Sequence, residues 1–444
     1  MSQNKISTEF SFSGLLKYAF PSIVMMLFIS LYTIADGLFV ARFVNTDALS
    51  ALNIIYPIQT VLGSVIFMFS AGGSALIGSL LGQKRDIEAS RTFSLIVLVV
   101  LILISVLAGI VFIFAENLII LLGADENMLP YALRYLRIFI CFIPAQTLKF
   151  MFESFFITAG KPSLGLGVTI GGGLFNIIFD YVFIVPLNMG IAGAALATGL
   201  SFCIPALIGI TFFFRNKTGL HFTEPTAPAW VIRKACLNGS SEMVTNLSTA
   251  VTTLVFNLLM MKYAGSYGVA AITAILYANF VMIALFLGFS MGVAPVISYH
   301  FGAKNTEYLK KLQKMCFSFI FVGSLAVFTV SFIGSPVIAD AFADKSSYVN
   351  ELIHYGMKIF SFAFIFSGVN IFASSHFTAL SDGKTSALIS FSRTFVFILL
   401  GIAILTALFG MDGVWISIPF AELMTTILVC IVYKRKAFKE KVNL

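Results

Sequence analysis

Long stretches without a single charged side chain constrain this chain more than any other feature. Residues 54–81, 93–114 and 162–179 are three such stretches. Each is long enough to cross, or nearly cross, a hydrocarbon core of about 30 Å at about 1.5 Å per helical residue. A membrane-spanning strand would instead show about ten residues of alternating polarity. The continuous runs therefore predict an all-α membrane protein.

Composition supports the same prediction. Only 11% of the 444 residues are charged, whereas soluble domains average about 25%. The apolar segments predict twelve transmembrane helices. They cover residues 15–41, 53–81, 92–115, 129–158, 163–187, 190–214, 235–263, 267–299, 315–338, 349–380, 385–408 and 413–433.

The distribution of basic residues predicts the orientation. Of the 28 Lys and Arg residues, twenty fall on the side that carries the N-terminus, six fall on the other side, and Lys149 and Arg393 lie within spans. The positive-inside rule then places both termini of a multi-pass cell-membrane protein in the cytoplasm. The net charge of +8 follows this topology, so we expect no nucleic-acid partner.

An internal repeat divides the chain into two halves. Residues 69–84 align without gaps to residues 289–304, and Gly190-Ile-Ala-Gly193 falls on Gly410-Met-Asp-Gly413 at the same shift of 220 residues. We expect two lobes of six helices, over residues 1–220 and 221–444. A parallel repeat of this kind commonly places a substrate site between two lobes that rock to expose it alternately. Duplication also builds channels, so the repeat alone does not establish transport.

The sequence offers little for enzymatic chemistry. No HExxH motif occurs, and the string Asp382-Gly383-Lys384-Thr385 has Thr378 where a P-loop needs its first glycine. We therefore expect neither an enzyme nor a cofactor. The cysteines occur singly, without CxxC spacing, and are interpreted as packing residues. The histidines are interpreted as polar loop or helix-end residues; they are His221, His300, His354 and His376.

Acidic residues inside the spans are the main functional candidates. An acid at the bilayer centre costs about 2.5–3.5 kcal/mol, and a proton or a bound cation that neutralises it removes much of that cost. Asp36 and Asp180 lie in the outer halves of spans 1 and 5, Asn176 is one turn before Asp180, and Thr198 lies in span 6. Their oxygens suit a small cation, and two neighbouring acids favour a shared proton. The alternative is that each acid is an unrelated structural group.

Other intramembrane residues suggest further roles. Lys149 is one turn before Glu153 on span 4, which predicts an ion pair within the helix. Glu242 is near the cytoplasmic end of span 7, and Glu422 is a weaker candidate. A substrate cavity lined by Met and aromatic side chains would hold apolar cations through soft contacts and cation–π attraction. The residues that we assign to this cavity are Glu242, Asn246, Asn257, Met26 and Met260.

Three stretches carry a resemblance to a known family. They are Glu153-Ser-Phe-Phe-Ile-Thr-Ala-Gly-Lys-Pro162, Asn176-Ile-Ile-Phe-Asp180-Tyr-Val-Phe-Ile-Val-Pro186 and Gly190-Ile-Ala-Gly-Ala-Ala-Leu-Ala-Thr198, with Pro21, Asp36, Leu49-Ser-Ala51 and Pro57 in the first two helices. Over essentially its full length the chain resembles the multidrug and toxic compound extrusion (MATE) transporters. The resemblance implies a V-shaped, twelve-helix antiporter that exports its substrate in exchange for inward H⁺ or Na⁺.

The resemblance also implies roles for single residues. In relatives with an acidic N-lobe the coupling ion is handled by residues that match Asp36, Asn176, Asp180 and Thr198, which would also bind the metal ion if the ion is Na⁺. The chain departs from the family at Val40-Ala-Arg42, where a glycine often precedes the arginine. Its C-terminal half has Asn257 near the position that corresponds to Asp36, and span 7 lacks the midspan carboxylate of another branch. Both features favour the bacterial branch with an acidic N-lobe.

The leading hypothesis is a monomeric secondary antiporter for small amphipathic or cationic organic compounds. The alternatives are a lipid-linked oligosaccharide flippase of the same superfamily, which would need a cationic cavity, a membrane-embedded enzyme, and a channel. Lys149 and Arg393, the basic residues within spans, keep the flippase in consideration.

Overall fold

The computed structural model describes residues 5–43, 46–216 and 219–442. It does not describe the side chains of residues 35–38, 40–42, 46–50 and 437–442. Within the described residues all regular structure is helical, as expected for a chain that must satisfy its backbone hydrogen bonds inside a bilayer. The N-half comprises η1 (Lys5–Ser7), α1 (Phe12–Phe43), α2 (Thr46–Gly82), α3 (Asp86–Ile113), α4 (Ala115–Leu121), α5 (Leu129–Cys141), α6 (Ile143–Thr158), α7 (Pro162–Ile184) and α8 (Ile191–Arg215). The C-half comprises α9 (Trp230–Gly302), α10 (Thr306–Ile333), α11 (Ser335–Phe342), α12 (Tyr348–Phe360), η2 (Ser361–Ala363), α13 (Phe364–Ala379), α14 (Gly383–Phe391), η3 (Ser392–Val396), α15 (Phe397–Phe409) and α16 (Met411–Val442).

These helices account for the twelve predicted spans within the described residues. Ten helical segments are long and apolar enough to cross a membrane, and α5 with α6 forms one more span that bends by 58°. The 73-residue α9 joins two spans, because Gly265 has φ 60° and ψ −146° and turns the chain back at that point. Only glycine adopts such a conformation readily. Counting α9 twice gives twelve, so the fold class is confirmed.

The backbone repeats at the shift that the sequence predicts. Helix α3 and helix α10 begin and end 220 residues apart, as their bounds show. Lys84 and Lys304 both have positive φ, of 60° and 55°. Gly190 and Gly410, at the starts of α8 and α16, share φ values of 56° and 60°. The two halves are therefore built on the same helical plan.

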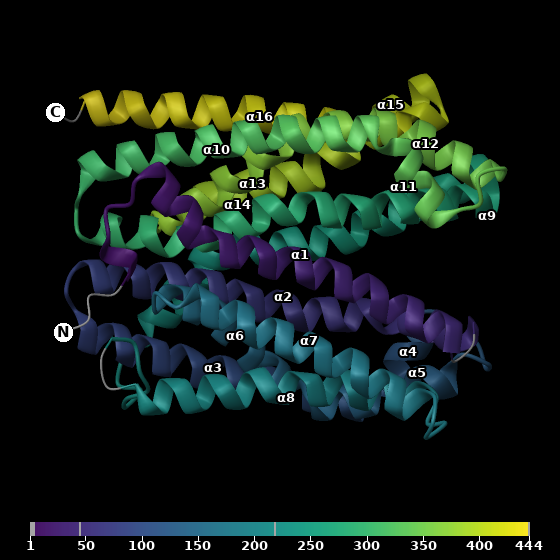
Figure 1. The fold of residues 1–444 in the computed structure, drawn as a ribbon, viewed down its shortest axis with the longest axis horizontal. Helices are drawn as coiled ribbons and strands as arrows, with labels where there is room; N and C mark the ends of the chain where they lie inside the picture. Colours follow the sequence, from purple (N-terminus) through teal and green to yellow (C-terminus); the bar gives the residue numbers. More distant parts are fainter. Residues whose placement is uncertain (1–4, 44–45, 217–218, 443–444) are drawn as a thin grey trace.

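The two halves lie side by side in Figure 1, with the N-half below and the C-half above, and η1 and the C-terminal end of α16 lie at the same end of the molecule. We call this the terminal end and the opposite one the far end. The closest approaches between the halves lie toward the terminal end. A Cβ atom on Gly288 of α9 would lie 2.6 Å from the Cα of Ile23 on α1, and one on Gly72 of α2 would lie 2.7 Å from the amide of Gly239 on α9. Any larger side chain at these glycines would push the halves apart.

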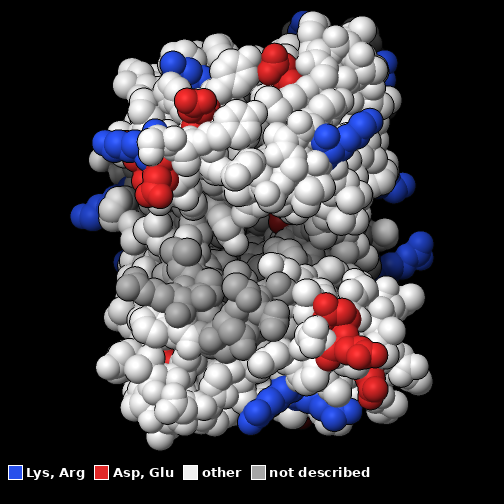
Figure 2. Space-filling model, turned by 90° about the vertical axis from the view of Figure 1, so that its right-hand side faces the viewer, with Lys and Arg blue, Asp and Glu red and all other residues white. Residues whose placement is uncertain are grey.

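The far-end face is recessed between the halves. Figure 2 looks onto this face and shows charged side chains around its edges and a hollow along its middle, where the C-half above meets the N-half below. Together with the glycine contacts at the opposite end, this shape describes halves that meet at the terminal end and separate toward the far end.

The N-terminal segment connects the two halves at the terminal end. The amide of Phe10 donates a hydrogen bond of 2.7 Å to the hydroxyl of Tyr308 on α10, and Asn305 donates one of 2.6 Å to the carboxylate of Glu9. Tyr18 on α1 donates to the carbonyl of Ile157 on α6. Residues 5–10 therefore contact the C-half, while the helix that follows is held in the N-half.

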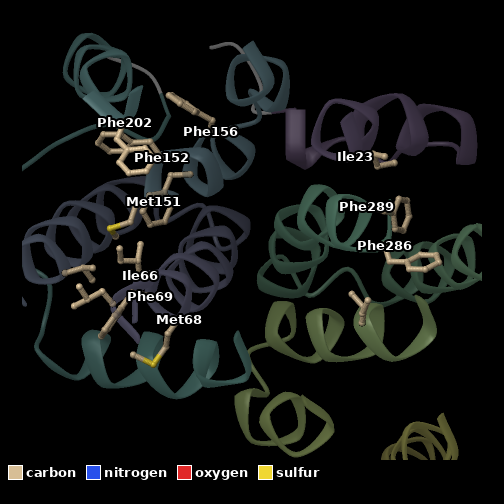
Figure 3. Close-up of a cluster of buried hydrophobic side chains, with 14 of the residues drawn as sticks. Ile23, Ile66, Met68, Phe69, Met151, Phe152, Phe156, Phe202, Phe286 and Phe289 are labelled. Carbon is tan, nitrogen blue, oxygen red and sulfur yellow. The ribbon is translucent and has the colours of Figure 1, made fainter. Parts of the chain in front are cut away.

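Aromatic and aliphatic side chains fill the interior of each half. Figure 3 shows Met151, Phe152 and Phe156 of α6 close to Phe202 of α8 in the N-half, and Phe286 and Phe289 of α9 in the C-half. The first three and the last two are almost completely buried. This packing fixes α6, α7 and α8, of which α6 and α7 carry the buried residues Lys149, Glu153, Asn176 and Asp180.

Candidate ion-coupling site

Helix α7 carries two of the predicted site residues on one face. Asn176 and Asp180 are one helical turn apart, and only 3% and 1% of their surfaces are exposed. Pro162 begins this helix at its first turn, where a missing backbone N–H costs nothing. Gly172 on the same helix approaches Ser201 and Pro205 of α8, so α7 and α8 pack closely. Thr198 lies on α8 one turn before Phe202, in the turn toward the far end.

Two of the predicted site residues have buried hydrogen-bonding groups without partners in the described part of the chain. The amide nitrogen of Asn176 and the hydroxyl of Thr198 are buried and make no hydrogen bond to the described part of the chain. Most buried polar atoms in proteins are paired, so such groups call for a water, an ion or a proton. The N-half therefore has polar groups available for a ligand beside Asp180.

The fourth predicted residue, Asp36, has a side chain outside the described residues. It lies on α1, four residues after Tyr32. Gly173 of α7 packs against the rings of Phe28 and Tyr32, so the turn of α1 before Asp36 contacts the turn of α7 before Asn176. The approach of Asp36 to Asp180 stays a prediction.

About two turns from Asn176 toward the terminal end, the predicted pair on α6 is present. The ammonium nitrogen of Lys149 lies 3.4 Å from a carboxylate oxygen of Glu153, and both residues are 3% exposed. The hydroxyl of Thr169 on α7 donates a hydrogen bond of 2.8 Å to the same oxygen. The i, i+4 spacing predicted the ion pair correctly, whereas Thr169 comes from another helix and gave no signal in the sequence.

Aromatic rings surround the Lys149 ammonium. It lies 4.2 Å from the centre of the Phe150 ring and 5.4 Å from that of Phe202 on α8, distances at which cation–π attraction operates. Tyr32 of α1 is near enough to interact with it electrostatically. The ammonium could donate three hydrogen bonds, and its carboxylate partner on Glu153 lies 3.4 Å away.

The C-half contains a different buried charge centre. Arg393 donates hydrogen bonds of 2.7–3.1 Å to both carboxylate oxygens of Glu422 on α16. Asn370 of α13 donates to the same carboxylate at 2.7 Å, and Thr426 donates to Asn370 at 3.0 Å. Arg393 lies in η3, a π-helical stretch between α14 and α15. This pairing was not predicted, because Arg393 and Glu422 lie 29 positions apart on different helices.

The predicted cavity residues have different environments. Glu242 is partly buried and interacts electrostatically with Arg393, and Asn246 donates to the backbone carbonyl of Glu242 at 2.8 Å. Met26 and Asn257 are also partly buried. Met260 is fully buried in the hydrophobic core, so its assignment to the cavity is wrong: its side chain packs against other apolar residues.

Two histidines lie at helix ends and are buried. His300 and His376 are in the last turns of α9 and α13, as the sequence predicts, and they are 3% and 5% exposed. His376 forms a hydrogen bond of 2.9 Å with Tyr433 of α16.

The P-loop-like string has a structural role. Asp382 caps α14 by accepting a hydrogen bond from the amide of Thr385. The described residues contain no group of three or more His, Cys, Asp or Glu side chains that could hold a metal ion.

Comparison with known proteins identifies the family. The family model described as MatE matches residues 21–182 and 243–408, one segment in each half. The chain is 25% identical over 415 residues to the multidrug export protein MepA of Staphylococcus haemolyticus, which covers 93% of this chain and 90% of that protein. It is also 25% identical over 427 residues to MepA of Staphylococcus aureus strain MRSA252, covering 93% and 91%.

Solved structures show the same fold. An outward-facing multidrug resistance MATE family transporter of the MOP superfamily superposes with a TM-score of 0.92 at 20% identity, over 100% of this chain and 99% of that one. A mutant of the Vibrio cholerae MATE transporter VcmN superposes with a TM-score of 0.90 at 18% identity, over 98% and 99%. The chain therefore belongs to the MatE family, whose members are membrane transporters and not enzymes.

Proposed function

We propose that this protein is a secondary antiporter that exports small amphipathic or cationic organic compounds across the cell membrane in exchange for H⁺ or Na⁺. The relatives named multidrug export protein support the substrate class. The observation that carries the coupling role is the burial of Asn176 and Asp180 on α7, together with buried groups of Asn176 and of Thr198 on α8 that have no partner in the described part of the chain. Asp36 completes the proposed site.

The coupling follows from the energetics of a buried carboxylate. A charged aspartate in this apolar setting is unfavourable unless a proton or a cation neutralises it. A change between the neutral and the charged state therefore alters the packing free energy of α1 against α7. Because α1 also contacts α9 of the C-half through Ile23 and Gly288, this change can bias the relative position of the halves.

The orientation that we propose has both termini in the cytoplasm. The terminal end, where the halves meet, is then the cytoplasmic end, and the recessed face in Figure 2 is open to the outside. Substrate would bind between the halves at Glu242, Asn246, Asn257 and Met26. Alternating access requires the terminal end to open as the far end closes. We propose that the protein works as a monomer, because each chain contains both halves.

A lipid-linked oligosaccharide flippase is the second candidate. It would need free basic groups for a pyrophosphate. The two basic residues within spans are instead paired with acids, Lys149 with Glu153 and Arg393 with Glu422. These pairings favour the antiporter.

The test is transport of ethidium, a permanently cationic amphipathic dye, by the full-length protein in proteoliposomes with pH and Na⁺ gradients imposed separately. Asp36→Asn and Asp180→Asn should each abolish gradient-driven export, whereas solute counterflow without a gradient continues. Leu400→Met is the matched control, because Leu400 occupies the position of Asp180 in the repeat. Driven export that persists in both asparagine variants would reject the coupling role.

A further inference from the structure

The Lys149–Glu153 pair has no role in the proposed transport cycle, yet it lies next to the proposed coupling site on the side toward the terminal end. Glu153 and Thr169 join α6 and α7 through their hydrogen bond. Lys149 is one turn from Glu153 toward the far end, a rise of about 6 Å. From Thr169, Asn176 is about 10 Å further along α7. The ammonium therefore lies between Glu153 and the level of Asn176.

Tyr32 connects this pair to the coupling site. It interacts with Lys149 and packs against Gly173, and Asp36 follows it by one turn of α1. The described residues thus supply a sequence of exchangeable protons from the level of Asp36 to Glu153: the Tyr32 hydroxyl, the Lys149 ammonium and the Glu153 carboxylate. The rings of Phe150, beside Lys149 on α6, and of Phe202 on α8 also face the ammonium.

The contacts of Lys149 are those of a group that can change partner. A structural lysine in an apolar interior normally satisfies its three donors. Lys149 instead has two partners that can exchange protons with it, the Glu153 carboxylate at 3.4 Å and the Tyr32 hydroxyl.

From this geometry, and on the basis of the antiport function above, we propose that Lys149 and Glu153 relay the coupling proton inside the N-half, so that the coupling ion is H⁺ and not Na⁺. In the first step the Lys149 ammonium gives one proton to the Glu153 carboxylate, which leaves a neutral amine and a neutral acid. The amine then takes a proton from the Tyr32 hydroxyl. The phenolate that this leaves takes a proton from the protonated acid of the coupling site. One proton has moved from the acid site to Glu153, and Lys149 and Tyr32 are unchanged.

Sodium has no equivalent path through this region. A sodium ion would need several oxygen ligands in place of its water. At Lys149 it would meet a positive charge and two aromatic rings. On leaving Glu153 a proton can continue toward the terminal end, where the hydroxyls of Thr158 and Ser74 hydrogen-bond at 2.6 Å.

The decisive variant is Lys149→Arg. Arginine keeps the positive charge and the ion pair but does not release its proton in proteins. Ethidium export driven by a pH gradient should fall by about tenfold or more, the scale at which positioned proton transfer contributes, while counterflow is unchanged. If the ion pair is only structural, the arginine variant will retain driven export, and the relay is rejected.

A second variant covers the case in which arginine does not fit beside the rings of Phe150 and Phe202. Lys149→Met with Glu153→Gln removes both charges at similar volume, which buried pairs often tolerate. It should fold, as judged by thermal unfolding, keep counterflow and lose driven export. Arg393→Met with Glu422→Gln is the matched control in the C-half and should keep both activities.

The remaining outcomes separate this proposal from the proposed function. Wild-type export driven by a Na⁺ gradient alone overturns the relay and leaves the antiporter standing. Loss of counterflow together with driven export in the folded lysine variants also overturns it. A wild-type protein without counterflow fails as a transporter, and both proposals fall with it.

Discussion

The two halves share a helical plan but keep their buried charge in different places. Asn176 and Asp180 of the N-half correspond, at the shift of 220 residues, to Val396 and Leu400 of the C-half. The polar pair Asn176 and Asp180 therefore has no polar counterpart at the equivalent positions of the second half. Because the helices match while these residues do not, backbone packing and ion chemistry are separable in this fold.

The reverse comparison is equally informative. Arg393 and Glu422 of the C-half correspond to Gly173 and Phe202 of the N-half. In the C-half the guanidinium makes three hydrogen bonds to its partner carboxylate, whereas the Lys149 ammonium lies 3.4 Å from its partner carboxylate. The Arg393 guanidinium does not lose a proton in proteins, and its bidentate pair with Glu422 fixes the helices of the C-half. The cation of the N-half pair is the ammonium of Lys149, which can lose a proton.

The largest expected effect on stability is that of Arg393→Met. It leaves the Glu422 carboxylate buried without its cation and should lower the free energy of unfolding by about 3–5 kcal/mol. Lys149→Met should cost less, because its contact is long and Thr169 still donates to Glu153. Thermal and denaturant unfolding in detergent compare the two. Equal losses would contradict the distinction between a fixed and a loosely held pair.

Asn370→Leu should have an intermediate effect. The amide donates to both the side chain and the backbone carbonyl of Glu422, so its loss should cost about 1–3 kcal/mol. The same unfolding measurement applies, and driven export of ethidium should persist in the folded fraction. If export is lost while the protein stays folded, the C-half centre takes part in transport.

The smallest expected effect is that of Thr169→Val, which removes the hydroxyl bonded to Glu153 at nearly constant volume. We expect a loss of about 1 kcal/mol. Thr211→Val, at an exposed threonine of α8, is the matched control and should be neutral. A loss at Thr169 as large as that of Arg393→Met would show that the N-half pair is held as firmly as the C-half pair.

Much of the fold could be predicted from the sequence because its signals are local. Uninterrupted apolar runs define spans, and the repeat at a constant shift defines the two halves. The Lys149–Glu153 pair was predictable for the same reason, since both residues lie on one face of one helix. The turn between the spans of α9 was anticipated as a boundary near Gly265.

The contacts between distant segments could not be predicted. Glu422 and Arg393 were each noted in the sequence, but their pairing depends on how α16 packs against η3. Tyr32 and Thr169 gave no signal, because a tyrosine or threonine in a span is common. Met260 was assigned to a cavity on residue type alone, and helix rotation placed it in the core.

The position of residues 5–10 has a practical consequence. Glu9 and Phe10 are bound to the second half of the molecule, whereas Lys436 of the last helix forms an ion pair with Asp382 inside that same half. A reporter or affinity label fused at the amino end would be attached to a segment that connects the two halves. One fused at the carboxyl end would be attached to the C-half alone, and is the better choice for measuring turnover.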